Sequence, residues 1–158
     1  MGSNKLEVFR EISIGGVTQE QLLQKLIGAG IKFNKYAEIL FAHPQFFPNE
    51  ESEKVKLVKV SLSDFGLSNP CSFQELTRRV SAFGLKSCPL YLGAFLRLDY
   101  LDQPAGPYLT IASVKPENDE NYPDGFYIRN FEESLWLRGY RADDVCEWPA
   151  ENEFIFIL

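Results

Sequence analysis

Hydrophobic residues recur along this chain at two different spacings, and the spacing changes part-way along. In the first half, three stretches place apolar residues three or four positions apart, which is typical of helices that pack one face on a core. These stretches are 18–28, 34–42 and 72–83. Thr18 and Gln21 have the spacing of a capping box, which supports a helix at the start of the first stretch.

Alternating apolar and polar positions, which are typical of strands, dominate the second half of the chain. We predict strands at 90–98, 107–114, 126–131, 135–141 and 154–158. A further strand is expected at 55–62, where the residues are β-branched. Another is expected around Ile12 and Ile14, although residues 6–12 also fit a helix.

The order of these elements predicts an α+β fold. Because 158 residues are the usual size of one domain, we expect a single domain over residues 1–158. Residues 1–87 form its helix-rich half and residues 88–158 its strand-rich half. Helices early and strands late favour a largely antiparallel sheet from the C-terminal half, with about three helices from the N-terminal half packed on one face.

The predicted strands of the second half have two different faces. Because successive side chains on a strand point to opposite sides, one side carries aliphatic residues that can pack on the helices. The other side carries rings and arginines: Tyr91, Phe95, Arg97, Tyr127, Arg129, Trp136, Arg138 and Tyr140. Trp, Tyr and Arg are enriched at binding hot spots, and Arg can hold a carboxylate or phosphate through two hydrogen bonds. These eight residues are the predicted ligand- or partner-binding surface.

The same rings and arginines also have a purely structural interpretation. Cross-strand aromatic pairs, and arginines stacked on rings, stabilise a sheet without binding anything. The terminal strand or residues 142–153 could also cover this face and turn it into a second small core. The sequence leaves these interpretations open.

The net charge of −6 is unevenly distributed along the chain. Residues 101–158 hold twelve acidic and four basic residues, which argues against nucleic acid as a partner because phosphate repels such a charge. A basic protein fits better, since acidic loops at 117–124, 132–133 and 143–153 would attract it. We therefore interpret the chain as a non-catalytic interaction domain with an unknown partner; neutralising or regulating a basic protein is one instance of such a role.

No pattern in the sequence supports catalysis, a metal site or a cofactor. His43 is the single histidine, and it stands before Pro44 at a predicted helix end, where a structural role is sufficient. There is no Cys-x-x-Cys pair and no complete glycine-rich dinucleotide motif. The three cysteines are expected to be small buried hydrophobes: Cys71, Cys88 and Cys146.

A small-molecule-binding protein or enzyme is the alternative function. Arg97, Arg129 and Arg138 would then hold an anionic ligand, such as a nucleotide or a carboxylate. Asp99 or Asp102 would act as the base, because carboxylates can do acid–base work without histidine.

The start of the chain lacks the apolar segment of a signal peptide, and no apolar run has the length needed to cross a bilayer. We therefore expect a cytoplasmic location and no membrane association.

Overall fold

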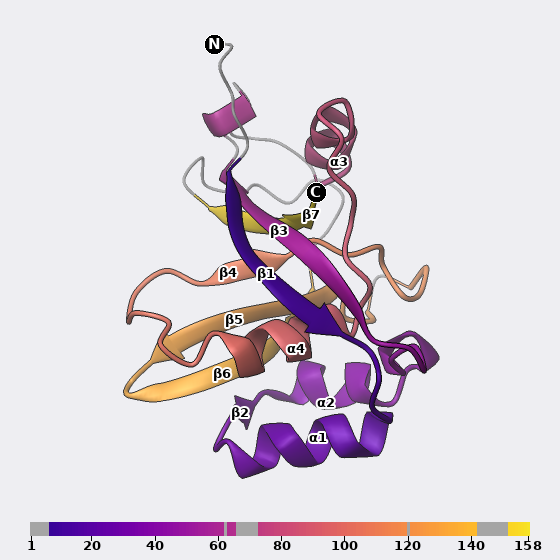
Figure 1. Cartoon of the computed structure of the whole chain (residues 1–158), viewed down its shortest axis with the longest axis vertical. Helices are drawn as coiled ribbons and strands as arrows, with labels where there is room; N and C mark the ends of the chain where they lie inside the picture. The colour runs from indigo at the N-terminus through magenta and orange to yellow at the C-terminus, as the bar shows by residue number, and fades with distance from the viewer. Residues whose placement is uncertain (1–6, 62, 66–72, 120, 142–151) are drawn as a thin grey trace.

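The computed structural model describes residues 7–61, 63–65, 73–119, 121–141 and 152–158. The elements in chain order are β1 (Val8–Ile14), α1 (Gln19–Gly28), β2 (Lys32–Phe33), α2 (Lys35–Phe41), β3 (Glu53–Ser61), α3 (Phe73–Ser81), α4 (Leu92–Asp99), β4 (Leu109–Ile111), β5 (Gly125–Phe131), β6 (Ser134–Tyr140) and β7 (Glu153–Ile157), with short 3-10 turns at Pro44–Phe46 and Ser63–Phe65 (Figure 1). No helix within the described ranges is both long enough and apolar enough to span a bilayer.

The strands form one mixed sheet in the order β1-β3-β7-β4-β5-β6-β2. Four of its pairings are antiparallel, and two, β2 with β6 and β4 with β7, are parallel. The predicted α+β class is therefore confirmed. The sheet is not made by the C-terminal half alone: β1 and β3 are the strands predicted around Ile12 and Ile14 and at 55–62, and β2 is a further strand from the first half.

Helices cover both faces of this sheet, rather than one. Buried side chains of α1, α2 and α4 join a large core with Leu57, Ile128, Leu137 and Ile155. In contrast, α3 packs in a second cluster with the neighbouring positions of the same strands, such as Val58. Strands β3 and β7 are apolar on both faces and therefore need cover on both, which places α3 opposite the other helices (Figure 1).

The most consequential difference from the sequence prediction is α4. The segment predicted as a strand at 90–98 is helical over Leu92–Asp99. Leucines at every second position also lie four residues apart, so Leu92 and Leu96 share a helix face as well. The segment contains Leu, Ala and Arg but no β-branched residue, and this composition favours a helix.

The other predicted helices and the C-terminal hairpin are confirmed. The expected capping box is present, with Gln21 N donating to Thr18 Oγ1 at 3.1 Å and Thr18 N donating to Gln21 Oε1 at 3.0 Å. Asn34 caps α2 by accepting a hydrogen bond from Ala37 N at 2.9 Å. Local sequence signals therefore located these elements correctly.

Candidate functional site

Strands β5 and β6 present a row of rings and arginines on the face that is turned away from α2 and α4. Their register pairs Tyr127 with Arg138 and Arg129 with Trp136, so these four side chains lie on one face. The opposite side chains, including Ile128 and Leu137, are buried in the large core. We refer to this row as the ladder; its members are Tyr127, Arg129, Phe131, Trp136, Arg138 and Tyr140.

The side chains of the ladder are stacked on one another. The guanidinium carbon of Arg138 lies 4.9 Å from the ring centroid of Trp136 and 5.9 Å from that of Tyr127. The guanidinium carbon of Arg129 lies 4.3 Å from the ring of Phe131. Each such contact contributes about 0.5–1 kcal/mol when exposed. The sequence prediction that the hairpin residues converge on one face is therefore confirmed.

Two further residues extend the ladder from elsewhere in the chain. Tyr108 packs on Tyr127 with ring centroids 4.9 Å apart. The ammonium group of Lys32 lies 5.9 Å from the ring centroid of Trp136, because β2 pairs with β6 at this position. Sequence reasoning missed both residues. The two-residue strand of Lys32 carries no periodic signal, and the contact of Tyr108 with Tyr127 joins segments that are not adjacent in sequence.

The cations of the ladder, Lys32, Arg129 and Arg138, form no ion pair with a carboxylate of the described residues. Arg129 Nε donates a 3.3 Å hydrogen bond to the carbonyl of Gly106. Arg138 Nε and Trp136 Nε1 are shielded from solvent and have no hydrogen-bond partner among the described residues. Such shielded, unpaired donors are uncommon in folded proteins.

The ladder becomes more exposed toward the hairpin turn. At one end, Tyr140 is half-buried and packs against the second hydrophobic cluster, beside α3. At the other end, the side chain of Phe131 is 38% exposed. The stacked arginines and Trp136 lie between them and are half-buried. The rings and guanidinium groups nearest the turn are therefore the most accessible to a binding partner.

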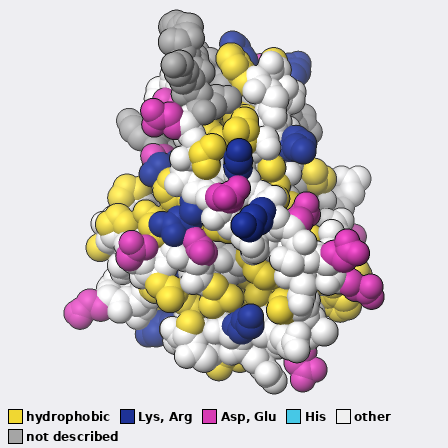
Figure 2. Space-filling view, viewed as in Figure 1, with side chains coloured by type: hydrophobic (Ala, Val, Ile, Leu, Met, Phe, Trp, Pro, Cys, Tyr) yellow, Lys and Arg dark blue, Asp and Glu magenta, His cyan; other side chains and the backbone are white. Residues whose placement is uncertain are grey.

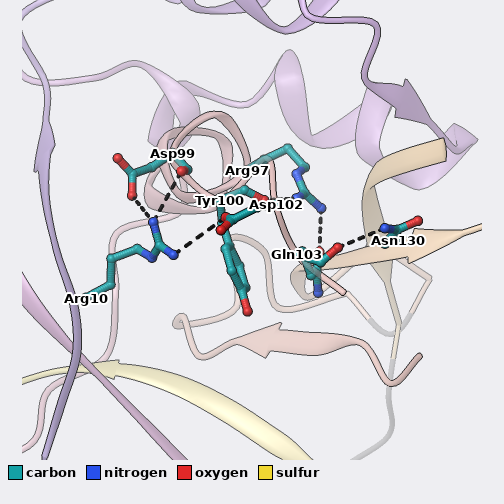
Figure 3. Close-up of polar contacts among 7 residues, drawn as sticks. All are labelled: Arg10, Arg97, Asp99, Tyr100, Asp102, Gln103 and Asn130. Atoms are coloured by element: carbon teal, nitrogen blue, oxygen red, sulfur yellow. Dashed lines mark hydrogen bonds and ion pairs between the residues drawn. The ribbon is translucent and has the colours of Figure 1, made fainter. Parts of the chain in front are cut away.

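Arg97 is not on this surface, contrary to the sequence prediction. Its side chain is fully buried in α4, on the core side of the hairpin (Figure 3). Its Nη1 donates to Gln103 Oε1 at 2.7 Å and, more weakly, to the carbonyls of Arg129 and Trp136 at 3.4 and 3.3 Å. Burial lowers the pKa of Arg97 to about 10, which leaves it charged at neutral pH. Arg97 therefore contacts the backbone of the ladder strands from the core side of the sheet.

Tyr91 and Phe95 are also separate from the ladder, because the segment that carries them is a helix. Tyr91 is 5% exposed, and burial raises the pKa of its hydroxyl. Its ring makes an edge contact with that of Phe95 at 6.0 Å. Phe95 lies on α4 at the border of the large core. The prediction that these two residues share a face with Trp136 is therefore wrong.

The position of β6 is fixed by α2. Asn34 Oδ1 accepts a 2.8 Å hydrogen bond from Gly139 N, and Asn34 Nδ2 donates a 2.9 Å bond to Gly139 O. A methyl group on Gly139 would lie 2.7 Å from the carbonyl carbon of Tyr36, so only glycine fits here. The cap of α2 thus also holds the strand that carries Trp136.

The alternative anion site with a carboxylate base is not assembled. Arg97 lies on the core side of β5–β6, whereas Arg129 and Arg138 lie on the opposite face, so the three arginines do not converge. Asp99 and Asp102 instead pair with Arg10, at 2.8 and 3.8 Å (Figure 3). The proposed base and the proposed anion-binding arginines are therefore in different places.

The single histidine has structural partners. His43 Nδ1 accepts a 3.0 Å hydrogen bond from Gln45 N, which leaves Nε2 to donate to Glu117 Oε2 at 2.7 Å. The described residues include no group of three or more His, Cys, Asp and Glu side chains placed to hold a metal ion. Of the cysteines, Cys88 is buried, and burial raises the pKa of its thiol. Cys71, Cys146 and the acidic stretch 143–151 lie outside the described residues.

Comparisons with known proteins add no assignment to this site. No protein-family model matches the chain, and neither a curated protein nor a solved structure matches it.

Proposed function

We propose that this protein is a non-catalytic interaction domain that uses the ladder to bind an acidic segment of a partner protein. The observation that carries the proposal is the stack of Arg138 on Trp136, in which each side chain holds a shielded hydrogen-bond donor that has no partner among the described residues. Rings provide contact area at low entropic cost, while guanidinium groups bind carboxylates with two hydrogen bonds.

Charge supports an acidic group as the direct contact. Lys32, Arg129 and Arg138 gather in one surface of a chain whose net charge is −6, without an ion pair among the described residues. A bound carboxylate would neutralise these cations, whereas a purely structural ladder would gain more from a carboxylate within its own sheet.

A basic partner remains part of this proposal in a secondary role. Glu132 and Glu133 are exposed at the hairpin turn, next to the ladder. They could attract positive charge on a partner while its acidic group binds the arginines, because complementary charges at the rim mainly steer association.

A small anionic ligand, such as a nucleotide, is the second candidate. The indole ring of Trp136 beside Arg138 offers a stacking surface next to a cation, which suits a planar ligand with a phosphate or carboxylate. A small anionic ligand would contact the same residues as an acidic protein segment, so the two candidates differ only in which of these ligands binds.

Isothermal titration with three probes, octaglutamate, ATP and octalysine, distinguishes these possibilities. We expect octaglutamate to bind the wild-type chain, and Arg138→Gln to raise its Kd by about tenfold, the effect of losing one charge-assisted hydrogen bond. Arg79→Gln is the matched control, because it removes the same charge from an exposed position of α3.

The outcomes separate the candidates. Binding of ATP but not octaglutamate would favour the small-ligand function. Equal losses with Arg138→Gln and Arg79→Gln would show a general charge effect and contradict a role of the ladder. Binding of octalysine alone would mean that the acidic loops, not the ladder, make the contact.

A further inference from the structure

The outer edge of β1 is open within the described part of the chain. Strand β1 pairs with β3 on one side and is the first strand of the sheet. Leu158 N donates a hydrogen bond to Lys56 O, so the N–H and C=O groups of Lys56 point toward β7. The N–H and C=O groups of the residues on either side of Lys56 point the other way, toward β1. Since Glu11 is opposite Lys56 and Ser13 is opposite Lys54, the N–H and C=O groups of Glu11 and Ser13 point outward.

A groove runs along this open edge, between β1 and the helices α1 and α4. It has a volume of about 670 Å³, and Glu11 and Ser13 line it from the strand. Its apolar part is made by Ile12, Val17, Phe95 and Leu98. Figure 2 views the molecule from this side and shows hydrophobic side chains gathered below a central group of charged ones, over the region of β1 and α4.

The charges at the two ends of the groove are different. At one end, Asp99 is neutralised by Arg10, whose Nη1 lies 2.8 Å from its carboxylate (Figure 3). At the other end, Lys25 of α1 lines the groove and an adjoining hollow that includes Gly16 and Gln21. Lys25 is exposed and forms no ion pair with a described carboxylate. The groove therefore carries the carboxylates of Glu11 and Asp99 and the ammonium group of Lys25, and of these three only Asp99 has an ion-pair partner among the described residues.

We propose that this groove binds a single extended peptide segment of a partner protein, which adds a strand to the edge of β1. Its backbone would pair with Glu11 and Ser13, and its alternate apolar side chains would pack on Val17, Phe95 and Leu98. An acidic side chain or terminal carboxylate would lie at Lys25. A lone strand fits better than a second folded copy, because Lys25 of α1 and Phe95 and Leu98 of α4 line the space beside the edge and would contact the side chains of an added strand.

One irregularity of the kind that protects open edges is present in β1, but it lies before Glu11. Proteins protect open edges with bulges, and β1 has a register shift between Val8 and Arg10. That irregularity lies before the stretch that lines the groove. From Glu11 onward the pairing with β3 is regular, so the outward groups keep the spacing that an added strand requires.

The test mixes the purified full chain with a soluble library of random heptapeptides with free carboxyl termini, isolates bound peptides by gel filtration and identifies them by mass spectrometry. We expect enriched peptides with apolar residues two positions apart and an acidic group at one end. Hydrogen exchange of the wild-type amides at 11–13 should slow when one of these peptides, resynthesised, is added.

Two variants identify the contact. Ser13→Pro removes an N–H group that points outward, at an edge position where proline is tolerated. This variant should raise the Kd of the peptide about tenfold, whereas the control Ser13→Ala, which keeps the N–H group, should not. Lys25→Glu should weaken binding of acidic peptides by about threefold and favour peptides whose acid is replaced by lysine. Arg138→Gln, in the ladder, should leave this binding unchanged.

Three results would overturn the proposal. These are no enrichment of any peptide, equal binding by wild type and by both groove variants, or a concentration-dependent dimer in sedimentation that Ser13→Pro abolishes. The last result would assign the edge to a second copy of this chain. If Ser13→Pro does not fold, the charge exchange at Lys25, an exposed position, decides the question.

Discussion

At the scale of single residues, Arg97 links the core to the ladder. Two of its hydrogen-bond acceptors are the carbonyls of Arg129 and Trp136, which face each other across β5 and β6. Gln103, which accepts from Arg97, also donates weakly to Ile128 O, and its carbonyl accepts from Asn130 Nδ2 at 2.8 Å (Figure 3). A buried cation is unfavourable unless it is surrounded by acceptors, and here two come from the hairpin and two, Gln103 Oε1 and the carbonyl of Tyr100, from the segment after α4.

Replacing Arg97 by Met should lower the free energy of unfolding by about 1–3 kcal/mol, because several carbonyl oxygens and Gln103 lose their donor inside the protein. Urea unfolding measures this change. Arg79→Met, at an exposed position, serves as the control and should have little effect. If the two variants were equally stable, Arg97 would not hold the hairpin.

The sequence could not reveal this role of Arg97. In an alternating pattern an arginine is assigned to the exposed face, and only tertiary packing shows that a helix brings it inside. The hairpin residues Tyr127, Arg129, Trp136 and Arg138 were predictable for the opposite reason. Their placement depends on strand alternation and a short turn, and both are local properties.

At the scale of elements, the turn between β5 and β6 is unusual. Its two central residues, Glu132 and Glu133, have φ values of 52° and 62°. Positive φ at both positions is typical of a type I′ turn, in which Asn and Gly are strongly preferred. Glutamate in the left-handed region costs about 1–2 kcal/mol per residue. The chain thus retains two unfavourable residues that place negative charge beside a basic ladder.

The double replacement Glu132→Asn and Glu133→Gly should raise the free energy of unfolding by about 1–2 kcal/mol, since both new residues accept positive φ. Thermal or urea unfolding measures this effect. The matched control is Glu132→Gln with Glu133→Gln, which removes the same charges without changing the turn preference. A stabilisation of equal size in the control would assign the effect to charge instead.

Local sequence patterns predicted most helices and strands correctly, but they predicted a strand where α4 is a helix. Caps such as Thr18 and Asn34 marked helix starts because the capping side chain and its backbone partner are close in sequence. The spacing of the leucines in α4 is compatible with a strand and with a helix, and the tertiary contacts of the segment determine which of the two forms. Leu92 and Leu96 are buried between the sheet and α1, where a helix fills the space.

At the scale of the whole molecule, the order of the strands completes the ladder. The sheet places β2 beside β6 and β4 beside β5, which brings Lys32 and Tyr108 to rings more than 15 residues away in sequence. No periodic pattern predicts such neighbours, so the sequence identified the centre of the ladder and missed its borders. The same order leaves β1 at the edge, where the second proposed binding surface lies.

The central claim is that Trp136 and Arg138 together receive an acidic group. The most direct measurement follows the indole N–H signal of Trp136 in two-dimensional NMR spectra, assigned by its loss in Trp136→Phe, during titration with octaglutamate. We predict a saturable shift of this signal in the wild type and in Arg79→Gln, and a much weaker response in Arg138→Gln. An indole signal that stays in place while octaglutamate binds elsewhere would contradict the proposed recognition surface.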